Sequence, residues 1–350
     1  MIFSKKPKGF FVEISEHSVL AARTSSASAP FEVEALQECA PDDPAALGAM
    51  LAQLQTRKSP TGFLHAAVGI YPGTRVVRRQ SVEPKRMRES GYFAELCAQQ
   101  LRIEADKYSL FLVNAADGSE FESTRTPPKE VVVCGLPSED AAAAQSSLLE
   151  ARIYPESIEL GSVATLGAVV DCLAQSKFKT PVLVLEVESE AMHSFIVTAN
   201  GVEASRPIPQ GLNAMIPIVQ KELGLKDEES ARRLFYSNTF DFTGMGPTLI
   251  KKLLKELQSS IGFYEVQTGQ SVGHVVTTQL SPKLQWIETA IATALGIKPL
   301  KLDTLPWLES RRITLRENLG ANPADTRWLG LFALMANYNA SDALAAEEKK

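Results

Sequence analysis

Short apolar runs separated by polar breaks open both halves of the chain. In the first half, Phe10–Ile14 is followed by a break and then by Ser18–Thr24; in the second half, Val182–Val187 and Ser194–Thr198 repeat this arrangement. Short runs rich in β-branched and aromatic residues, bounded by turn residues, are typical of strands. The pattern therefore predicts two hairpins, and with them two related lobes that face each other across a cleft.

Helical spacing of apolar residues follows the second hairpin. Leu212–Leu223 and Thr248–Ile261 each place their apolar residues on one stripe, with charged residues opposite in the second of them. Gly273–Ser281 then predicts a strand and a loop, and Gln285–Leu295 predicts a further helix. The second half is thus a hairpin, a helical insert, and a strand-loop-helix unit.

The first half is interrupted by a separate group of elements. After the predicted strands Leu64–Tyr71 and Thr74–Val82, the pattern changes at Glu83, and helices alternate with strands up to about residue 158. The predicted organisation is a first lobe at 1–82 and 159–180, a side subdomain at 83–158, a second lobe at 181–210 and 272–338, a helical subdomain at 211–271, and a tail at 339–350.

Composition places the chain among soluble proteins. It has 350 residues, 45% apolar and 22% charged, with a net charge of -5. No apolar run approaches the roughly 20 residues that a membrane helix needs, and no signal peptide is recognisable. We therefore expect a cytoplasmic protein that does not bind nucleic acid. The four cysteines and four histidines are scattered, which disfavours a zinc site.

One basic cluster stands out against the acidic whole. We interpret it as a solvated strand-and-helix face, with a phosphate- or lipid-binding patch as the alternative. Its members are Arg75, Arg78, Arg79, Lys85, Arg86 and Arg88.

Several segments resemble the PilM family, the actin-like proteins of type IV pilus assembly, which are relatives of FtsA. The start Met1–Lys8 followed by a hairpin, the segment Val76–Pro84, the stretch Leu148–Pro155 and the long helix before Tyr264 are each similar to the family pattern in the same order. The resemblance implies an α/β, actin-like ATPase fold, with two ribonuclease H-like lobes, inserted subdomains, and ATP and magnesium in the cleft.

The sequence departs from the family at the three nucleotide loops. Where the family has Asp-hydrophobic-Gly in each hairpin, this chain has Glu13-Ile-Ser15-Glu16 and Glu186-Val-Glu188. Where the family has a Gly-Gly pair near the adenine, this chain has Thr278 and Gln279. Phosphate loops need glycine so that backbone N–H groups can approach the phosphate oxygens. In addition, two like unit charges about 4 Å apart repel by roughly 4 kcal/mol at an effective dielectric constant near 20, so carboxylates here would repel a triphosphate.

We therefore expect no competent ATP chemistry, no catalytic residue and no bound cofactor. Under this interpretation the glutamates, including Glu190, are solvated hairpin-tip residues. The alternative is an ATPase or switch with unusual loops, in pilus assembly, secretion or cell division, with Glu13 or Glu186 as magnesium ligands. An FtsA-like division protein is disfavoured, because residues 339–350 lack an amphipathic membrane helix.

Two smaller motifs carry less weight. The glycine-rich stretch Phe240–Gly246 follows no predicted strand, which favours a turn or a partner-facing loop over a phosphate loop. His17 with Glu13, or His193 with Glu190, lacks a nearby nucleophile, so acid–base catalysis by either pair is disfavoured.

The resemblance also implies a partner. PilM binds the cytoplasmic amino-terminal peptide of the inner-membrane protein PilN, in a groove between the first lobe and its side subdomain. We therefore expect a cytoplasmic scaffold that reaches the membrane through a PilN-like, single-span protein. Arg78, Arg79 and Arg86 beside the 83–158 subdomain are candidates to contact acidic residues of such a peptide. The contact residues and the oligomeric state stay open.

Overall fold

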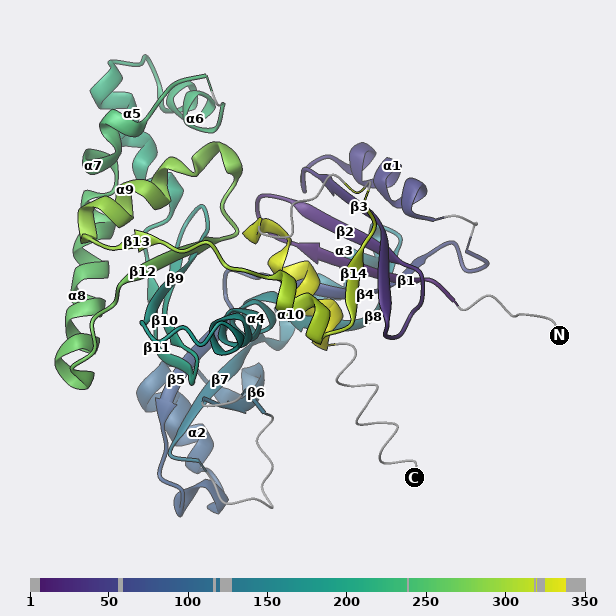
Figure 1. The fold of residues 1–350 in the computed structure, drawn as a ribbon, viewed down its shortest axis with the longest axis horizontal. Coiled ribbons are helices and arrows are strands. Elements are labelled where there is room, and N and C mark those ends of the chain that lie inside the picture. The colour runs from purple at the N-terminus through teal and green to yellow at the C-terminus, as the bar shows by residue number, and fades with distance from the viewer. Residues whose placement is uncertain are drawn as a thin grey trace.

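The computed structural model describes residues 7–55, 59–115, 118–119, 128–237, 239–317, 319 and 325–337. In these ranges the chain forms two lobes, each built on one sheet, and a smaller third sheet that lies below them in the view of Figure 1. The predicted tail at 339–350 lies outside the described residues. Within the ranges described, no helix is long and apolar enough to cross a membrane.

Each lobe contains one of the predicted hairpins. The first sheet contains β1 (Gly9–Ile14), β2 (Val19–Thr24), β3 (Phe31–Cys39), β4 (Leu64–Ile70), β8 (Ile153–Leu160) and β14 (Ile313–Leu315). The second contains β9 (Val182–Val187), β10 (Met192–Thr198), β11 (Gly201–Ile208), β12 (His274–Thr278) and β13 (Lys298–Pro299). Their orders are β14-β3-β2-β1-β4-β8 and β11-β10-β9-β12-β13. In both, the hairpin's first strand pairs in parallel with the next strand, β4 or β12, so the lobes repeat one topology.

Helices cover these sheets. Those associated with the first lobe are α1 (Pro44–Leu54), α3 (Ser138–Glu150), α4 (Gly161–Gln175), α10 (Leu305–Ser310) and a helix over residues 329–337. Those of the second are α5 (Ile216–Leu223), α6 (Glu228–Tyr236), α7 (Gly246–Leu249), α8 (Lys251–Thr268) and α9 (Trp286–Leu295). All six residues of β9 are buried, which fits its mostly apolar sequence, and its one charged residue, Glu186, is buried with the others.

Helix α4 lies between the lobes. It contacts β8 of the first sheet and both β10 and β11 of the second. Its sequence is apolar on more than one stripe, and nine of its 15 residues are buried. A helix that is apolar nearly all round must be covered on several sides. α4 is therefore the central element that joins the two lobes (Figure 1).

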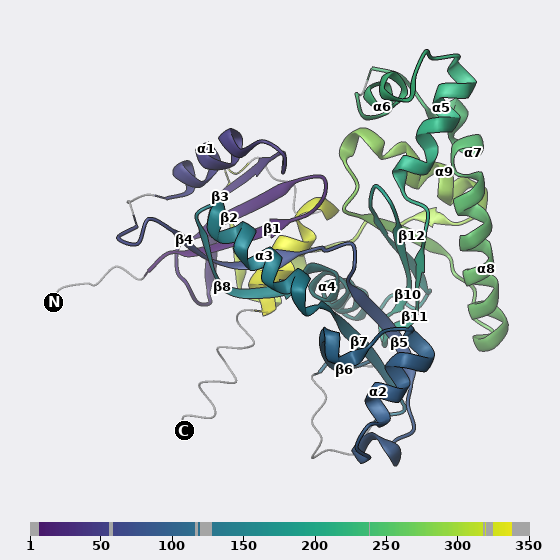
Figure 2. The same ribbon diagram turned by 180° about the vertical axis from the view of Figure 1, so that it is seen from behind.

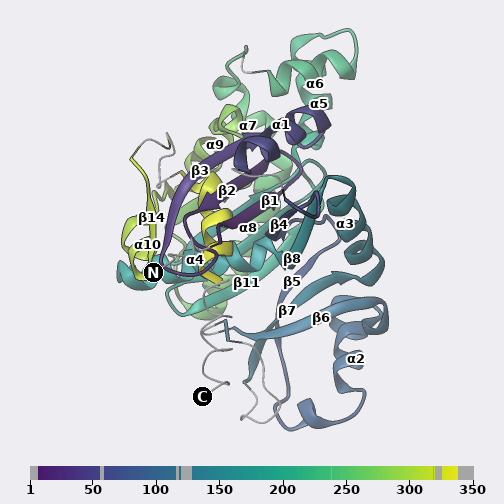
Figure 3. The same cartoon turned by 90° about the vertical axis from the view of Figure 1, so that its right-hand side faces the viewer.

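The third sheet forms the side subdomain, but its limits differ from the prediction of 83–158. It contains β5 (Val76–Ser81), β7 (Glu130–Pro137) and β6 (Tyr108–Asn114) in the order β5-β7-β6, with α2 (Tyr92–Leu96) beside it (Figure 3). β5, predicted to belong to the first lobe, pairs with β7. β8, predicted to belong to the insert, pairs with β4 in the first sheet.

The error at both ends has one cause. The change of pattern at Glu83 marks a change from strand to helix inside the subdomain, and local sequence does not show which strand pairs with which. Helix α3 contacts β8, and the two lie side by side on the first lobe (Figure 2). The chain therefore enters the subdomain near Arg75 and returns to the first lobe through α3.

Candidate functional site

The two hairpins bring their carboxylates together between the lobes. Glu13 is the last residue but one of β1, and Glu186 is the last but one of β9. Both side chains are buried, with 2% and 0% exposed. The Glu186 carboxylate is close enough to contribute to the raised pKa of Glu13. The cleft expected from the paired hairpins is thus closed around these residues.

Arg75 provides the positive charge in this buried region. Its Nη2 donates to Glu186 Oε2 over 2.8 Å and lies 2.5 Å from Glu188 Oε1. Its Nε donates to Ser162 Oγ over 2.6 Å, and that hydroxyl donates to Glu186 Oε2 over 2.8 Å. Burial alone would lower the pKa of Arg75, but the two carboxylates outweigh it and raise that pKa. We call Arg75, Ser162, Glu186 and Glu188 the Arg75 cluster.

The Arg75 cluster joins elements that are distant in sequence. Arg75 immediately precedes β5, Ser162 lies in the first turn of α4, Glu186 lies in β9 of the second lobe, and Glu188 directly follows that strand. A buried ion pair offsets its desolvation cost only while both partners remain, and removing one leaves an uncompensated buried charge. The cluster therefore holds the second hairpin against α4 and the start of the side subdomain.

Glu13 reaches the second lobe through a different contact. Gln279 Nε2 donates to Glu13 Oε1 over 2.9 Å. Burial raises the pKa of Glu13 to about 7, because the hydrogen bond from Gln279 offsets only part of that cost. Gly330, in the last helix, passes close by: a Cβ there would lie 2.5 Å from Glu13 Oε2 and 2.6 Å from the Tyr71 hydroxyl. Only glycine lets that helix approach so closely.

The third loop keeps a glycine-like backbone without a glycine. Gln279 has a φ of 61°, in the left-handed region, which costs a residue with a Cβ roughly 1–2 kcal/mol. Its side chain bridges the lobes through Glu13, a contact that glycine does not offer. Thr278 is buried, and its hydroxyl lies 3.5 Å from the Leu185 carbonyl oxygen, at the limit of a hydrogen bond.

The rim of the cleft is tied together by polar contacts. Ser15 Oγ accepts from the backbone N–H of Ser18 over 3.2 Å, which closes the first hairpin turn on itself. Glu16 Oε2 accepts from the backbone N–H of Ser189 over 2.6 Å and so links the two hairpin tips. Glu190 accepts from Asn213 Nδ2 over 2.7 Å. The polar groups named here at the rim thus form hydrogen bonds with other groups of the chain.

The interpretation of the glutamates as solvated residues is right for Glu16 and Glu190, which are exposed, and wrong for Glu13, Glu186 and Glu188, which are buried. Glu186 and Glu188 are buried against Arg75, a residue of the basic cluster predicted to be solvated, whereas Glu13 is buried against Gln279 and Gly330. The cavity beside Gln279 has a volume of about 40 Å³ and is lined by none of these three buried glutamates.

The three arginines expected to contact a partner peptide do not lie at the boundary between the side subdomain and the first lobe. Arg79 is held by Glu130 and Glu203, at 3.2 and 2.8 Å, and ties the third sheet to β11. Arg86 pairs with three glutamates of its own subdomain. Arg78 lines a separate groove against α8. None of the three lines the cavities between the side subdomain and the first lobe.

An apolar groove of about 540 Å³ lies between the side subdomain and the first lobe. Strands β6 and β8, which border it, are each the outer strand of their sheet. Phe111 on β6 and Ile158 on β8 are 39% and 38% exposed, so each outer strand presents a large apolar side chain at the groove. Other apolar side chains of the groove are Leu110, Leu136, Leu160 and Val163.

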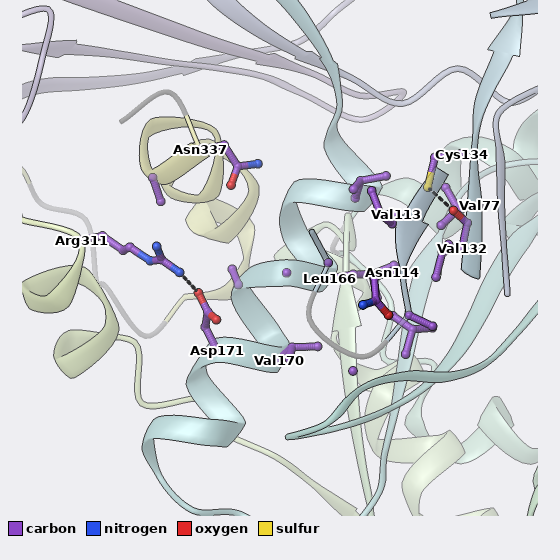
Figure 4. A pocket seen from close by; sticks show the side chains of 18 residues that line it. Val77, Val113, Asn114, Val132, Cys134, Leu166, Val170, Asp171, Arg311 and Asn337 are labelled. Carbon is purple, nitrogen blue, oxygen red and sulfur yellow. Dashed lines mark hydrogen bonds and ion pairs between the residues drawn. The ribbon is translucent and has the colours of Figure 1, made fainter. Parts of the chain in front are cut away.

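A second cavity adjoins this groove. It has a volume of about 220 Å³ and is lined by valines of the third sheet and of α4, with an ion pair between Asp171 and Arg311 at one side (Figure 4). Val163 and Asn337 line both the groove and the cavity. An apolar cavity of about 150 Å³ can hold a benzene-sized group, so this one has room for a large apolar side chain.

Comparisons with known proteins bear on the fold. No protein-family model matches the sequence, and no curated protein matches it. Among solved structures, one of a "PilM-PilN type IV pilus biogenesis complex" is similar with a TM-score of 0.68 and 16% identity, over 95% of this chain and 98% of that chain. The ethanolamine utilization protein EutJ from Carboxydothermus hydrogenoformans gives 0.46 and 11%, over 94% of this chain and 89% of that chain.

A third neighbour is a Bacteroides thetaiotaomicron protein with an actin-like ATPase fold, with a TM-score of 0.46 and 10% identity, over 96% of this chain and 98% of that chain. At these identities the likeness shows the fold alone. The chain has the two-lobed actin-like ATPase fold, and the predicted fold class and its resemblance to PilM are confirmed at that level.

Glu13→Gln should change how stability depends on pH. The pKa of Glu13 is about 7 in the folded chain against 4.5 ordinarily, so the folded state binds more protons and stability falls as pH rises through this window. At about 1.4 kcal/mol per pKa unit the effect is roughly 3 kcal/mol. Urea unfolding measured at several pH values should show the variant's free energy of unfolding rising relative to that of the wild type between about pH 4.5 and about pH 7. A constant difference would contradict the raised pKa.

Arg75→Met should lower the free energy of unfolding by about 3–5 kcal/mol, because it leaves Glu186 and Glu188 buried without a cation. Arg86→Met is the matched control: Arg86 also makes three ion pairs, but at the surface, so its loss should change stability little. Denaturant unfolding of both variants measures this. Equal, small losses would show that the Arg75 cluster does not hold the lobes together.

Proposed function

We propose that this chain is a cytoplasmic, PilM-like scaffold that binds the amino-terminal cytoplasmic peptide of a PilN-like, single-span inner-membrane protein. The observation that carries the proposal is the apolar groove between β6 and β8, in a chain whose fold is similar to that of PilM in a PilM-PilN complex. Through this partner the scaffold would reach the inner face of the membrane and serve pilus assembly.

The composition of the cleft supports a role without ATP turnover. ATP with magnesium is the group that the fold suggests, and the residues present do not fit it. Glu186, a conceivable magnesium ligand, is already paired with Arg75 over 2.8 Å. Glu13, the other, has a pKa of about 7 and so is partly protonated near neutral pH. The Arg75 cluster supplies from the chain itself the positive charge that magnesium would bring.

The shape of the groove supports a peptide as the ligand. Extended peptides bind by adding backbone hydrogen bonds to an outer strand and by placing apolar side chains in pockets. Both bordering strands are outer strands, and the adjoining 220 Å³ cavity gives a side-chain pocket. Ordering a flexible peptide costs free energy, so a short segment should bind with micromolar affinity, near 8 kcal/mol.

The test is a calorimetric titration with the amino-terminal cytoplasmic peptide of a PilN-like, single-span membrane protein. Phe111→Asp and Ile158→Asp should each weaken binding at least about tenfold, which is about 1.4 kcal/mol, because they place a charge on the groove's apolar rim. Phe263→Asp is the control, since Phe263 is 66% exposed on α8, outside the groove. Absence of binding at high micromolar peptide would remove the proposal's support.

A further inference from the structure

One carboxylate lies inside the apolar groove. Glu159 on β8 lines it beside Leu110, Phe111 and Ile158. Its Oε2 accepts a hydrogen bond from Asn337 Nδ2 over 3.3 Å. Over the ranges that the structure describes, no lysine or arginine pairs with it. Burial raises the pKa of Glu159, and only the bond from Asn337 opposes that rise.

A carboxylate in such a position is costly to the free chain. Glu159 is half-buried; even partial removal of a charge from water without a counter-charge is unfavourable, and a single long amide hydrogen bond offsets little of that cost. The described lining from β4, β6, β7, α3, α4 and the last helix is otherwise apolar or neutral, with no second titratable side chain. Whatever fills the groove therefore meets one negative charge among apolar walls.

We propose that the groove selects an apolar peptide segment that carries one basic group, a lysine or arginine side chain, placed to pair with Glu159. This proposal rests on the proposed function and names the chemistry of the partner. It reverses the expectation of an acidic peptide, because Arg79 and Arg86 are already paired and Arg78 lies in another groove.

The pairing would give specificity as well as affinity. A basic group of the peptide would form an ion pair with the Glu159 carboxylate in a site from which the bound peptide excludes water. An acidic residue in the same place would be repelled by Glu159 and would also lose its own hydration. A bound cation favours ionised Glu159, so proton and peptide compete for it. Peptide affinity should therefore fall as the pH is lowered from about 8 to about 5, and Glu159→Gln should remove this fall.

The probe is a random twelve-residue peptide display library selected on the full-length chain. Enriched peptides should be apolar with at least one lysine or arginine. The most enriched one, made synthetically, is then titrated against the wild type, Glu159→Gln and Glu156→Gln. Glu156 is the control because it lies on the same strand but outside the groove lining. Glu159→Gln should weaken binding about tenfold, and Glu156→Gln should not.

A double-mutant cycle completes the test. Replacing the basic residue of the peptide by norleucine should cost about as much as Glu159→Gln, and the two changes together should cost little more than either. Unchanged affinity in Glu159→Gln, with loss in Phe111→Asp, would overturn this inference and leave the groove as the peptide site. Binding insensitive to both variants, or no enriched peptide, would overturn the proposed function and this inference with it.

Discussion

The closed cleft depends on one buried cation. Arg75 places its guanidinium within 2.8 Å of Glu186 and 2.5 Å of Glu188, in a region where neither carboxylate is more than slightly exposed. In an actin-like fold the resemblance leads one to expect magnesium and phosphate between the hairpins. Here the chain itself supplies both the positive charge and the carboxylate oxygens that pair with it. The lobes are therefore held together by side chains of the protein, and this pairing needs no added ligand.

This interaction also reaches the surface where we place the partner. Arg75 lies two residues before Val77, which lines the apolar cavity, and Ser162 lies beside Val163, which lines both the cavity and the groove. The start of β5 and the start of α4 thus contribute residues both to the contacts that close the cleft and to the walls of the cavity and the groove. A cleft that stays closed keeps the groove walls in one arrangement, which suits a scaffold.

Local patterns were enough to predict the hairpins and the helices of the second half, because alternating and helical periodicities are properties of neighbouring residues. The fold class came from the resemblance to the PilM family. Local patterns did not place β8, whose partner β4 lies almost ninety positions earlier, at Leu64 for Ile153. The departures from the nucleotide loops were visible as glutamates at 13, 186 and 188. Their burial was not, because Glu186 and Glu188 are buried against Arg75, which is 111 positions from Glu186 and belongs to no motif. Gln279 likewise gave no signal of its contact with Glu13.

The most direct test is a thermal scan of the full chain with and without millimolar Mg-ATP. A ligand at 100 times its Kd stabilises a folded protein by about 2.7 kcal/mol, which shifts Tm measurably. Because the Arg75 cluster places the chain's own cation and carboxylates between the hairpins, we expect the same Tm with Mg-ATP as with magnesium alone. A clear rise in Tm that requires ATP would show that the cleft opens to a nucleotide and would contradict this account.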